Sequence, residues 1–109
     1  IHADRKMIEQ VLVNLVKNAI AAISKTQGGE VVLSAKLSDH GVIVKVQDNG
    51  EGIEEDLINQ IFVPFFSTRK NGSGIGLSLS KNIMKMHEGD LKVQSQEGLG
   101  TSFIMLFKE

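Results

Sequence analysis

The sequence predicts an α+β domain in which helices pack on one face of a sheet, as a two-layer sandwich. Three observations predict it: a long N-terminal segment with helical apolar periodicity, two pairs of alternating apolar segments that are each joined by a short turn, and further helical segments between those pairs. Strands joined by short turns pair antiparallel, so we expect a mixed, mostly antiparallel sheet. A chain of 109 residues is the size of one domain.

The first element is a helix that begins after Asp4, a favourable N-cap residue, and runs to about Ser24. Its apolar residues recur at steps of three and four, which predicts one buried stripe. Gln27, Gly28 and Gly29 end the segment. The stripe consists of Ile8, Val11, Leu12, Leu15, Val16, Ala19 and Ile23.

Two strands follow, at residues 31–37 and 42–47, around turn residues 39–41. Asp48 has the same parity as the valines of the second strand, so its side chain is expected on the helix-covered face, at the end of the strand. Because an unpaired carboxylate is costly to bury, we expect hydrogen-bond donors around Asp48, from the protein or from a ligand.

The second half of the chain continues with helices and strands. We expect a short helix at residues 54–60, irregular chain at 62–74, and a helix at 75–87 that stops at Gly89. Leu91 and Val93 belong to a third strand, and the turn at residues 97–100 leads into a fourth. The apolar candidates of the later helix are Leu77, Leu79, Ile83, Met84 and Met86, and one face of the fourth strand carries Thr101, Phe103, Met105 and Phe107.

Composition excludes several classes of function. The net charge of −1 gives no basic footprint for nucleic acid or for an anionic membrane surface. No apolar run approaches the about 20 residues of a membrane span. The absence of cysteine excludes disulfides and thiolate chemistry. The chain begins at Ile1 rather than Met, so we expect it to be a fragment of a longer protein.

Asn14 and Asn18 lie four residues apart, on one face of the first helix. Asparagine is a poor helix former, so two of them inside a helix need a reason. Their amide oxygens suit Mg²⁺ and phosphate contacts. Taken alone, the pair is more often explained by amides that cap nearby backbone groups.

The stretch Asp48-Asn49-Gly50-Glu51-Gly52 follows the second strand. In a binding site, Asp48 would accept a hydrogen bond from an amino group on a ligand ring, and the glycines would let the backbone approach that ring. The alternative is a plain loop, because Asn-Gly is a turn signal by itself. The inward parity of Asp48 favours the binding site.

A glycine-rich stretch, Gly-Ser-Gly-Ile-Gly-Leu at residues 72–77, opens the later long helix. Free N–H groups at a helix start suit a phosphate, and Arg69 and Lys70 are placed to neutralise its charge. The spacing matches neither a Walker A loop nor the dinucleotide fingerprint. A flexible linker is the alternative.

In this order the motifs make the chain similar to the catalytic, ATP-binding domain of sensor histidine kinases, in the GHKL superfamily with gyrase, MutL and heat-shock chaperone ATPases. The resemblance implies the Bergerat ATP-binding fold, with a mobile ATP lid at residues 62–73 whose phenylalanines pack the lid or a partner domain. It covers nearly the whole chain. Five blocks carry it: the N box at 14–19, the first G box at 48–53, the F box at 61–66, the second G box at 72–77 and a closing glycine block at 98–103.

The resemblance also implies roles for individual residues. Asp48 would hydrogen-bond the adenine amino group, with support from Thr101. Asn18 would coordinate Mg²⁺ at the phosphates, with Asn14 assisting. The other implied contacts are the walls of the adenine slot at Ala22, Ile53 and Leu77, backbone donors to phosphate at Ser73, Gly74, Ile75 and Gly76, close backbone approach at Gly50 and Gly52, and positive charge at Lys17, Arg69 and Lys70.

Two positions depart from the family's pattern. Many members carry a basic residue three positions after the metal-binding asparagine, where this chain has Ala21, so the positive charge at the phosphates rests on the basic residues just named. Arg69 stands where lysine is frequent, which keeps the charge but changes its geometry. The short lid and the run at 65–69 resemble the nitrogen- and oxygen-sensing branch of the kinases.

The implied function is that of a kinase domain that binds ATP and Mg²⁺ and donates the γ-phosphate to a histidine, in two-component signal transduction. None of His2, His40 and His87 lies in the family's His-Glu-x-x-x-Pro pattern, so the acceptor is expected on a separate, histidine-containing dimerisation domain. A response regulator is the second implied partner. The implied location is the cytoplasm, or the cytoplasmic part of a membrane-bound sensor, and we expect the fragment alone to be a monomer.

Three alternatives remain open. ATPases of the gyrase or MutL type place glutamate one helical turn before the metal-binding asparagine, as a base for water; this chain has Asn14 there, and an amide cannot accept a proton. Serine kinases of the anti-sigma-factor type keep the same glutamate. The third alternative is a nucleotide-sensing module without catalysis, against which the intact metal and lid motifs argue.

Overall fold

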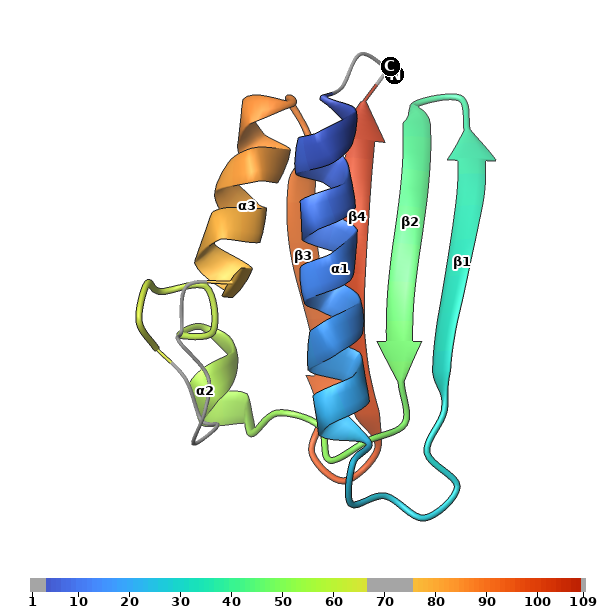
Figure 1. Ribbon diagram of the computed structural model, residues 1–109, viewed down its shortest axis with the longest axis vertical. Helices are drawn as coiled ribbons and strands as arrows, with labels where there is room; N and C mark the ends of the chain where they lie inside the picture. Colours follow the sequence, from blue (N-terminus) through green and yellow to red (C-terminus); the bar gives the residue numbers. More distant parts are fainter. Residues whose placement is uncertain (1–3, 67–75, 109) are drawn as a thin grey trace.

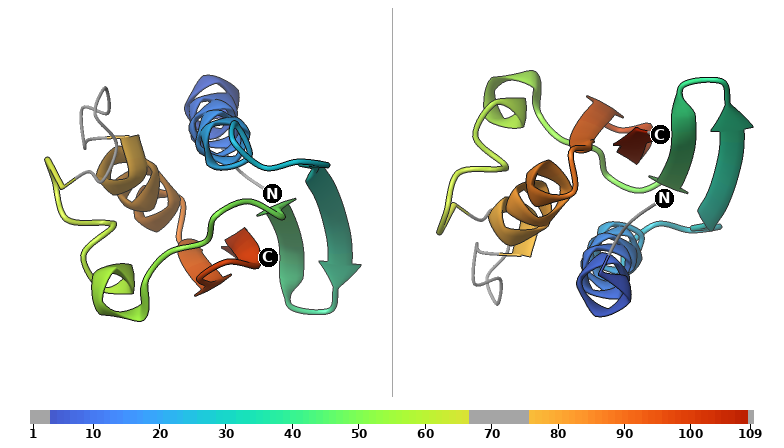
Figure 2. Two further views of the ribbon diagram at one scale, coloured as in Figure 1. Left: turned by 90° about the horizontal axis from the view of Figure 1, so that it is seen from below. Right: turned by 90° about the horizontal axis from the view of Figure 1, so that it is seen from above.

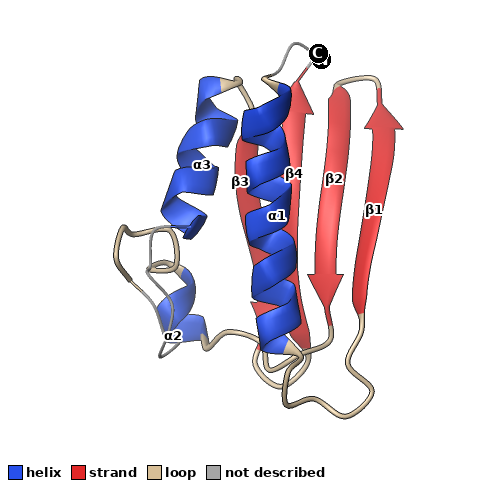
Figure 3. Ribbon diagram, in the orientation of Figure 1, coloured by secondary structure: helices blue, strands red, loops and turns tan. Residues whose placement is uncertain are grey.

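The computed structural model describes residues 4–66 and 76–108. Helices and strands follow one another in the predicted order (Figure 3). None of the helices in this part of the chain has the length and apolar character needed to cross a membrane. The elements are α1 (Arg5–Ala22), β1 (Val31–Ser38), β2 (Gly41–Asp48), α2 (Glu55–Ile58), α3 (Gly76–Met86), β3 (Asp90–Gln96) and β4 (Gly100–Lys108).

The four strands form one sheet in the order β1-β2-β4-β3. The predicted fold class is confirmed, and each of the three pairings between the described strands is antiparallel rather than mixed. Strands β1 and β2 form one hairpin and β3 and β4 form another, and α2 and α3 carry the chain between them. The register of β2 with β4 sets Asp48 opposite Thr101, which brings the ends of two sequence motifs together.

Helices α1 and α3 lie side by side on one face of the sheet (Figures 1 and 2). The predicted N-cap of α1 is confirmed, since Oδ1 of Asp4 accepts the N–H of Met7 at 3.2 Å. The short α2 lies beside the β3 edge of the sheet (Figure 2). The core between the layers consists of Val11, Leu15, Ala19, Val46, Ile61, Ile83, Met84, Leu91, Phe103, Met105 and Phe107.

The buried face of α3 differs from the predicted one. Leu79 is 45% exposed and Met86 is 67% exposed, whereas Ser78 and Ser80 are buried. Helix α3 packs on α1 as well as on the sheet, and its residue Ser80 contacts Asn14 of α1 through a hydrogen bond. Apolar periodicity was therefore a poor guide here, because a small polar residue occupies the contact between the two helices.

The end of α3 also differs from the prediction. The left-handed residue is Glu88, with a φ of 61°, and not Gly89. The N–H of Gly89 donates to the carbonyl oxygen of Met84 at 2.9 Å. A Cβ on Gly89 would lie 2.2 Å from the carbonyl oxygen of Leu106. Glycine is therefore required there by the close approach of β4 and not by the turn itself.

Candidate functional site

Asp48 is the last residue of β2 and is 5% exposed. Its side chain lies on the helix-covered face, as predicted from its parity with the buried Val46. The backbone N–H of Gly50 donates to Oδ1 of Asp48 at 2.9 Å, which closes a turn. The expectation that this buried carboxylate has a hydrogen-bond donor is therefore confirmed.

The glycines after Asp48 allow the loop to pack between α1 and the turn that joins β3 and β4. A Cβ on Gly50 would lie 2.3 Å from the carbonyl oxygen of Ala22, the last residue of α1. Gly52 has a φ of 73°, and a Cβ there would lie 2.2 Å from the carbonyl oxygen of Gln96. Both positions exclude side chains, so this loop holds Ala22 close to the end of β2.

A pair of hydroxyl groups lies at the same end of the sheet. The Oγ1 of Thr101 is 2.8 Å from the Oγ of Ser95, which also accepts the N–H of Ile53 at 2.8 Å. The hydroxyl group of Ser95 also donates to the carbonyl oxygen of Gly100 at 3.0 Å. Because Thr101 is paired with Asp48 in the register, its hydroxyl group and that carboxylate belong to one polar corner.

Two residues of this corner were not predicted. Ser95 has the same parity as the buried Leu91 of β3, a signal that was present in the sequence. Asn49 accepts the N–H of Glu30 at 2.6 Å through Oδ1 and donates from Nδ2 to the carbonyl oxygen of Gly28 at 3.1 Å. These bonds fasten the loop before β1 to the end of β2. No pattern in the sequence distinguishes them from an ordinary Asn-Gly turn.

A second group of predicted site residues lies where α1 meets the start of α3. Nδ2 of Asn14 donates to the carbonyl oxygen of Gly76 at 3.4 Å and to Oγ of Ser80 at 3.3 Å. Oδ1 of Asn14 accepts from Nε2 of Gln10 at 3.1 Å. The structure thus brings the N box and the last glycine of the second G box into direct contact.

Asn14, Asn18 and Ala22 follow one another at steps of four residues on α1, so their side chains form one row. Asn18 is half-buried, Ala22 is buried, and Lys17 is exposed beside them. The row runs from the contact with α3 to the loop at Gly50. It therefore connects the two groups of predicted site residues.

The remaining predicted residues divide into two sets. Ile53 and Leu77, the first set, are half-buried and pack against the core. On the metal site, no group of three or more His, Cys, Asp or Glu side chains within residues 4–66 and 76–108 is placed to hold a metal ion. The predictions for Arg69, Lys70, Ser73, Gly74 and Ile75 fall outside the described residues.

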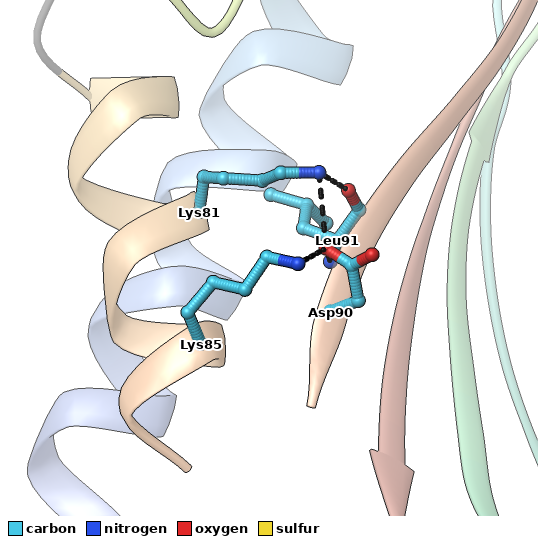
Figure 4. A network of polar contacts seen from close by, with 4 residues as sticks. All are labelled: Lys81, Lys85, Asp90 and Leu91. Atoms are coloured by element: carbon cyan, nitrogen blue, oxygen red, sulfur yellow. Dashed lines mark hydrogen bonds and ion pairs between the residues drawn. The ribbon is translucent and has the colours of Figure 1, made fainter. Parts of the chain in front are cut away.

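A network of charges fastens α3 to the start of β3 (Figure 4). Nζ of Lys81 donates to the carbonyl oxygen of Leu91 at 2.7 Å and lies 3.0 Å from Oδ1 of Asp90. The same Nζ lies 4.8 Å from the centre of the Phe62 ring. Burial raises the pKa of Asp90, but the hydrogen bond from Lys81, the N–H of Leu91 and the charges of Lys81 and Lys85 outweigh it and leave that pKa lowered.

The chemistry of these groups fits a nucleotide. At the strand end, a buried carboxylate and a hydroxyl group beside the apolar Ala22 and Ile53 suit a flat ring that carries an amino group. At the other end of the row, the amide of Asn18 suits a hard cation, and the positive end of the helix dipole at the start of α3 suits an anion. A nucleotide therefore suits these groups, and Asn18 is the described residue that could hold a metal ion.

Comparisons with known proteins agree with this chemistry. Residues 3–109 match the family model described as histidine kinase-, DNA gyrase B- and HSP90-like ATPase. The chain is 41% identical over 106 residues to the signal transduction histidine-protein kinase AtoS and 43% identical over 105 residues to the sensor histidine kinase ZraS, both of Escherichia coli (strain K12). These matches cover 97% and 96% of this chain but only 17% and 22% of the relatives, so the chain spans about a fifth of their length.

Solved structures give the same picture. The catalytic domain of the histidine kinase ThkA, in a nucleotide-free form, superposes with a TM-score of 0.84 at 37% identity, over 97% of this chain and 68% of that one. A mycobacterial sensor histidine kinase, MprB, shares the fold with a TM-score of 0.87 at 24% identity, over 99% of this chain and 76% of that one. The resemblance drawn from the motifs is confirmed. The chain belongs to the family of histidine kinase-, DNA gyrase B- and HSP90-like ATPases, and within it to the catalytic domains of histidine kinases.

Proposed function

We propose that this chain binds Mg²⁺-ATP along α1 and donates the γ-phosphate to a histidine on a separate domain. The observation that carries the proposal is the row of Asn14, Asn18 and Ala22, which joins the buried carboxylate corner to the start of α3. The groups of ATP follow one another in the matching order, with an amino-bearing ring at one end and phosphates at the other.

In this proposal the polar corner at the end of β2 receives the adenine. Asp48 accepts the hydrogen bond of the ring amino group, and Thr101 supports it from the neighbouring strand. Ala22 and Ile53 provide apolar contact with the ring. Gly50 and Gly52 let the loop backbone come close, and Leu77 closes the slot from α3.

The phosphates are assigned to the other end of the row. Asn18 is the proposed Mg²⁺ ligand, with Asn14 beside it and Lys17 adding positive charge. Gly76 and the residues before it supply backbone N–H groups. The family resemblance assigns the same task to Ser73, Gly74 and Ile75, and charge neutralisation to Arg69 and Lys70.

Phosphoryl transfer needs little covalent chemistry from the protein, so the role of these residues is to position the phosphates and stabilise their charge. Asn14 occupies the position at which ATPases of the gyrase or MutL type have a glutamate that acts as the general base. An amide cannot take a proton from water. This favours a kinase over an ATPase. In His87, Nε2 accepts the N–H of Asp4 at 3.0 Å and Nδ1 contacts the carbonyl oxygen of Ile83 at 2.7 Å, which supports an acceptor histidine elsewhere.

The partners follow from the same proposal. They are ATP and ADP, a histidine-containing dimerisation domain and a response regulator. We propose a cytoplasmic location for the domain, either free or as part of a membrane-bound sensor, and a monomeric state for the chain by itself.

Calorimetric titration with ADP or a non-hydrolysable ATP analogue, with and without Mg²⁺, tests the proposal. We expect one saturable site whose affinity rises with Mg²⁺, and an Asn18→Ala variant that remains folded but loses the Mg²⁺ dependence. Phosphotransfer to an added histidine-domain fragment is the second step. No binding to a folded sample would overturn the proposed function, whereas binding without any phosphotransfer would favour a nucleotide-sensing module.

A further inference from the structure

Asn14 is hydrogen-bonded at every kind of atom in its amide. A carboxamide has two N–H donors and one acceptor oxygen. Both donor contacts of Asn14 go to α3, to the carbonyl oxygen of Gly76 and to the hydroxyl group of Ser80. Its oxygen accepts from Gln10, one turn earlier on α1. The side chain therefore links the two helices through the protein's own groups.

The carbonyl oxygen of Gly76 decides which way round this amide lies, and Gln10 supports that orientation. If the amide of Asn14 were turned by a half rotation, its oxygen would face the carbonyl oxygen of Gly76, and two acceptors would oppose each other. A donor from Gln10, 3.1 Å from the oxygen, favours the observed orientation. Glutamine is suited to this task because it reaches residue i+4 on the same helical face.

Ser80 receives the second donor and is fully buried. A buried hydroxyl group without a partner is costly, so Asn14 satisfies Ser80 as much as Ser80 anchors Asn14. This contact also explains why a serine stands where helical periodicity favours a larger apolar residue. A bulky side chain at this position would occupy the space of the hydrogen bond.

We propose that Gln10 and Ser80 are positioning residues of the nucleotide site. Gln10 holds the amide oxygen of Asn14, and Asn14 holds the start of α3 against α1 through Gly76 and Ser80. The phosphate-binding end of the site is thus preset by two residues that need not touch the nucleotide. The link between the helices stands on its own contacts, while its effect on affinity rests on the proposed function.

The far end of the same helix pair offers a matched control. There the N–H of Asp4, the N-cap of α1, donates to Nε2 of His87 at 3.0 Å, just after the end of α3. A His87→Ala variant removes this contact between the same two helices without touching the first turn of α3. This variant therefore distinguishes a general weakening of the packing between α1 and α3 from a local effect on the nucleotide site.

Amide hydrogen exchange without nucleotide tests the link directly. Ser80→Ala keeps a good helix former, and Gln10→Glu replaces the donor by an acceptor of the same shape. We expect each variant to speed exchange of the N–H groups of residues 80 and 81 by about fivefold, the scale of one lost hydrogen bond. His87→Ala should leave these amides unchanged. Unchanged exchange at residues 80 and 81 in both test variants would overturn the proposal.

Titration with Mg²⁺-ADP then measures the effect on the site. Here Gln10→Met removes the donor without adding charge near the phosphates. We expect Ser80→Ala and Gln10→Met each to weaken binding by about fivefold and His87→Ala to leave it unchanged. If the wild-type chain bound no nucleotide, the proposed function would fail, and the exchange result would still decide whether the link exists.

A double-mutant cycle distinguishes positioning from independent contacts. Asn14→Ala already removes the bond to Ser80, so adding Ser80→Ala should cost no further affinity. If the two losses instead multiplied, Asn14 and Ser80 would act separately, and the positioning role of Ser80 would be wrong.

Discussion

The residues at the two ends of the proposed nucleotide site are positioned by different kinds of interaction. At the strand end, Asp48 and Thr101 are buried and are placed by strand pairing, and the hydroxyl and backbone contacts around them are short, at 2.8 and 2.9 Å. At the helix end, Asn14 and Gly76 are placed by side-chain hydrogen bonds between two helices, at 3.3 and 3.4 Å. The strand end is therefore set by the backbone of the fold, while the helix end depends on a few side chains.

This difference predicts that substitutions at the strand end act mainly on stability or on ring recognition. Substitutions at the helix end should act more mildly, through the position of α3. The variants of Gln10, Asn14 and Ser80 described above test the helix end. Four predictions, from the largest expected effect to the smallest, test the strand end and the charges that hold α3 to β3.

Gly100→Ala should destabilise the chain by at least about 3 kcal/mol. Gly100 has a φ of 132°, and an added Cβ would lie 2.1 Å from the carbonyl oxygen of Asp48, so β4 would have to move away from β2. Urea unfolding measures the change. Gly98→Ala is the control, because Gly98 also has a positive φ, of 84°, but has open space around it. Equal losses in the two variants would mean that the packing of this strand end is not what matters.

Asp48→Asn should weaken nucleotide binding by about 2 kcal/mol or more, the scale of a charged hydrogen bond in a buried site. The fold should persist, because an asparagine oxygen can still accept the N–H of Gly50. Calorimetric titration gives the affinity. Asp90→Asn makes the same chemical change on β3, outside the proposed site, and should leave affinity near the wild-type value. Wild-type affinity in Asp48→Asn would rule out the adenine contact.

Ser95→Ala should cost about 1 to 2 kcal/mol of stability, since it leaves the N–H of Ile53 without its partner and removes the hydrogen-bond partner of the Thr101 hydroxyl group. A weaker nucleotide affinity should accompany the loss, because Ile53 and Thr101 both border the proposed adenine position. Chemical unfolding and calorimetry measure the two effects. Ser34→Ala, at an exposed position on β1, is the matched control and should change neither. A silent Ser95→Ala variant would show that the strand end is held by the backbone alone.

The smallest expected effect concerns the charges that hold α3 to β3. The pKa of Asp90 is lowered in the folded chain, so its contribution to stability is present above the unfolded pKa of about 3.9 and is lost as the pH falls through the folded value. We expect Asp90→Asn to be less stable than the wild type by under about 1 kcal/mol at pH 7. The difference should vanish in acid, once the pH has fallen below the lowered pKa that Asp90 has in the folded chain. A difference that is independent of pH would mean that shape, not charge, fastens α3 here.

The contrast between the two ends also explains what could be predicted. The burial of Asp48 and the shared face of Thr101 and Phe103 follow from the two-residue period of a strand, which leaves little freedom once one face is known. Along α3 the same kind of reasoning was wrong at Leu79 and Met86. A helix that packs against a sheet and a second helix at once has a buried face that its own apolar pattern does not define.

The sequence by itself determined the order of helices and strands, the antiparallel hairpins, the N-cap at Asp4 and the family, because these depend on local periodicity and on motifs that are contiguous in the chain. Only the tertiary structure decided that Ser95 joins Ile53 to Thr101, that Glu88 and not Gly89 turns the end of α3, and that Asn14 spans two helices. The hydrogen bonds join residues from different elements, in most cases far apart in the chain, and the conformation at residues 88 and 89 depends on how closely β4 approaches. Their partners are chosen by the packing of the layers, which local sequence patterns do not encode.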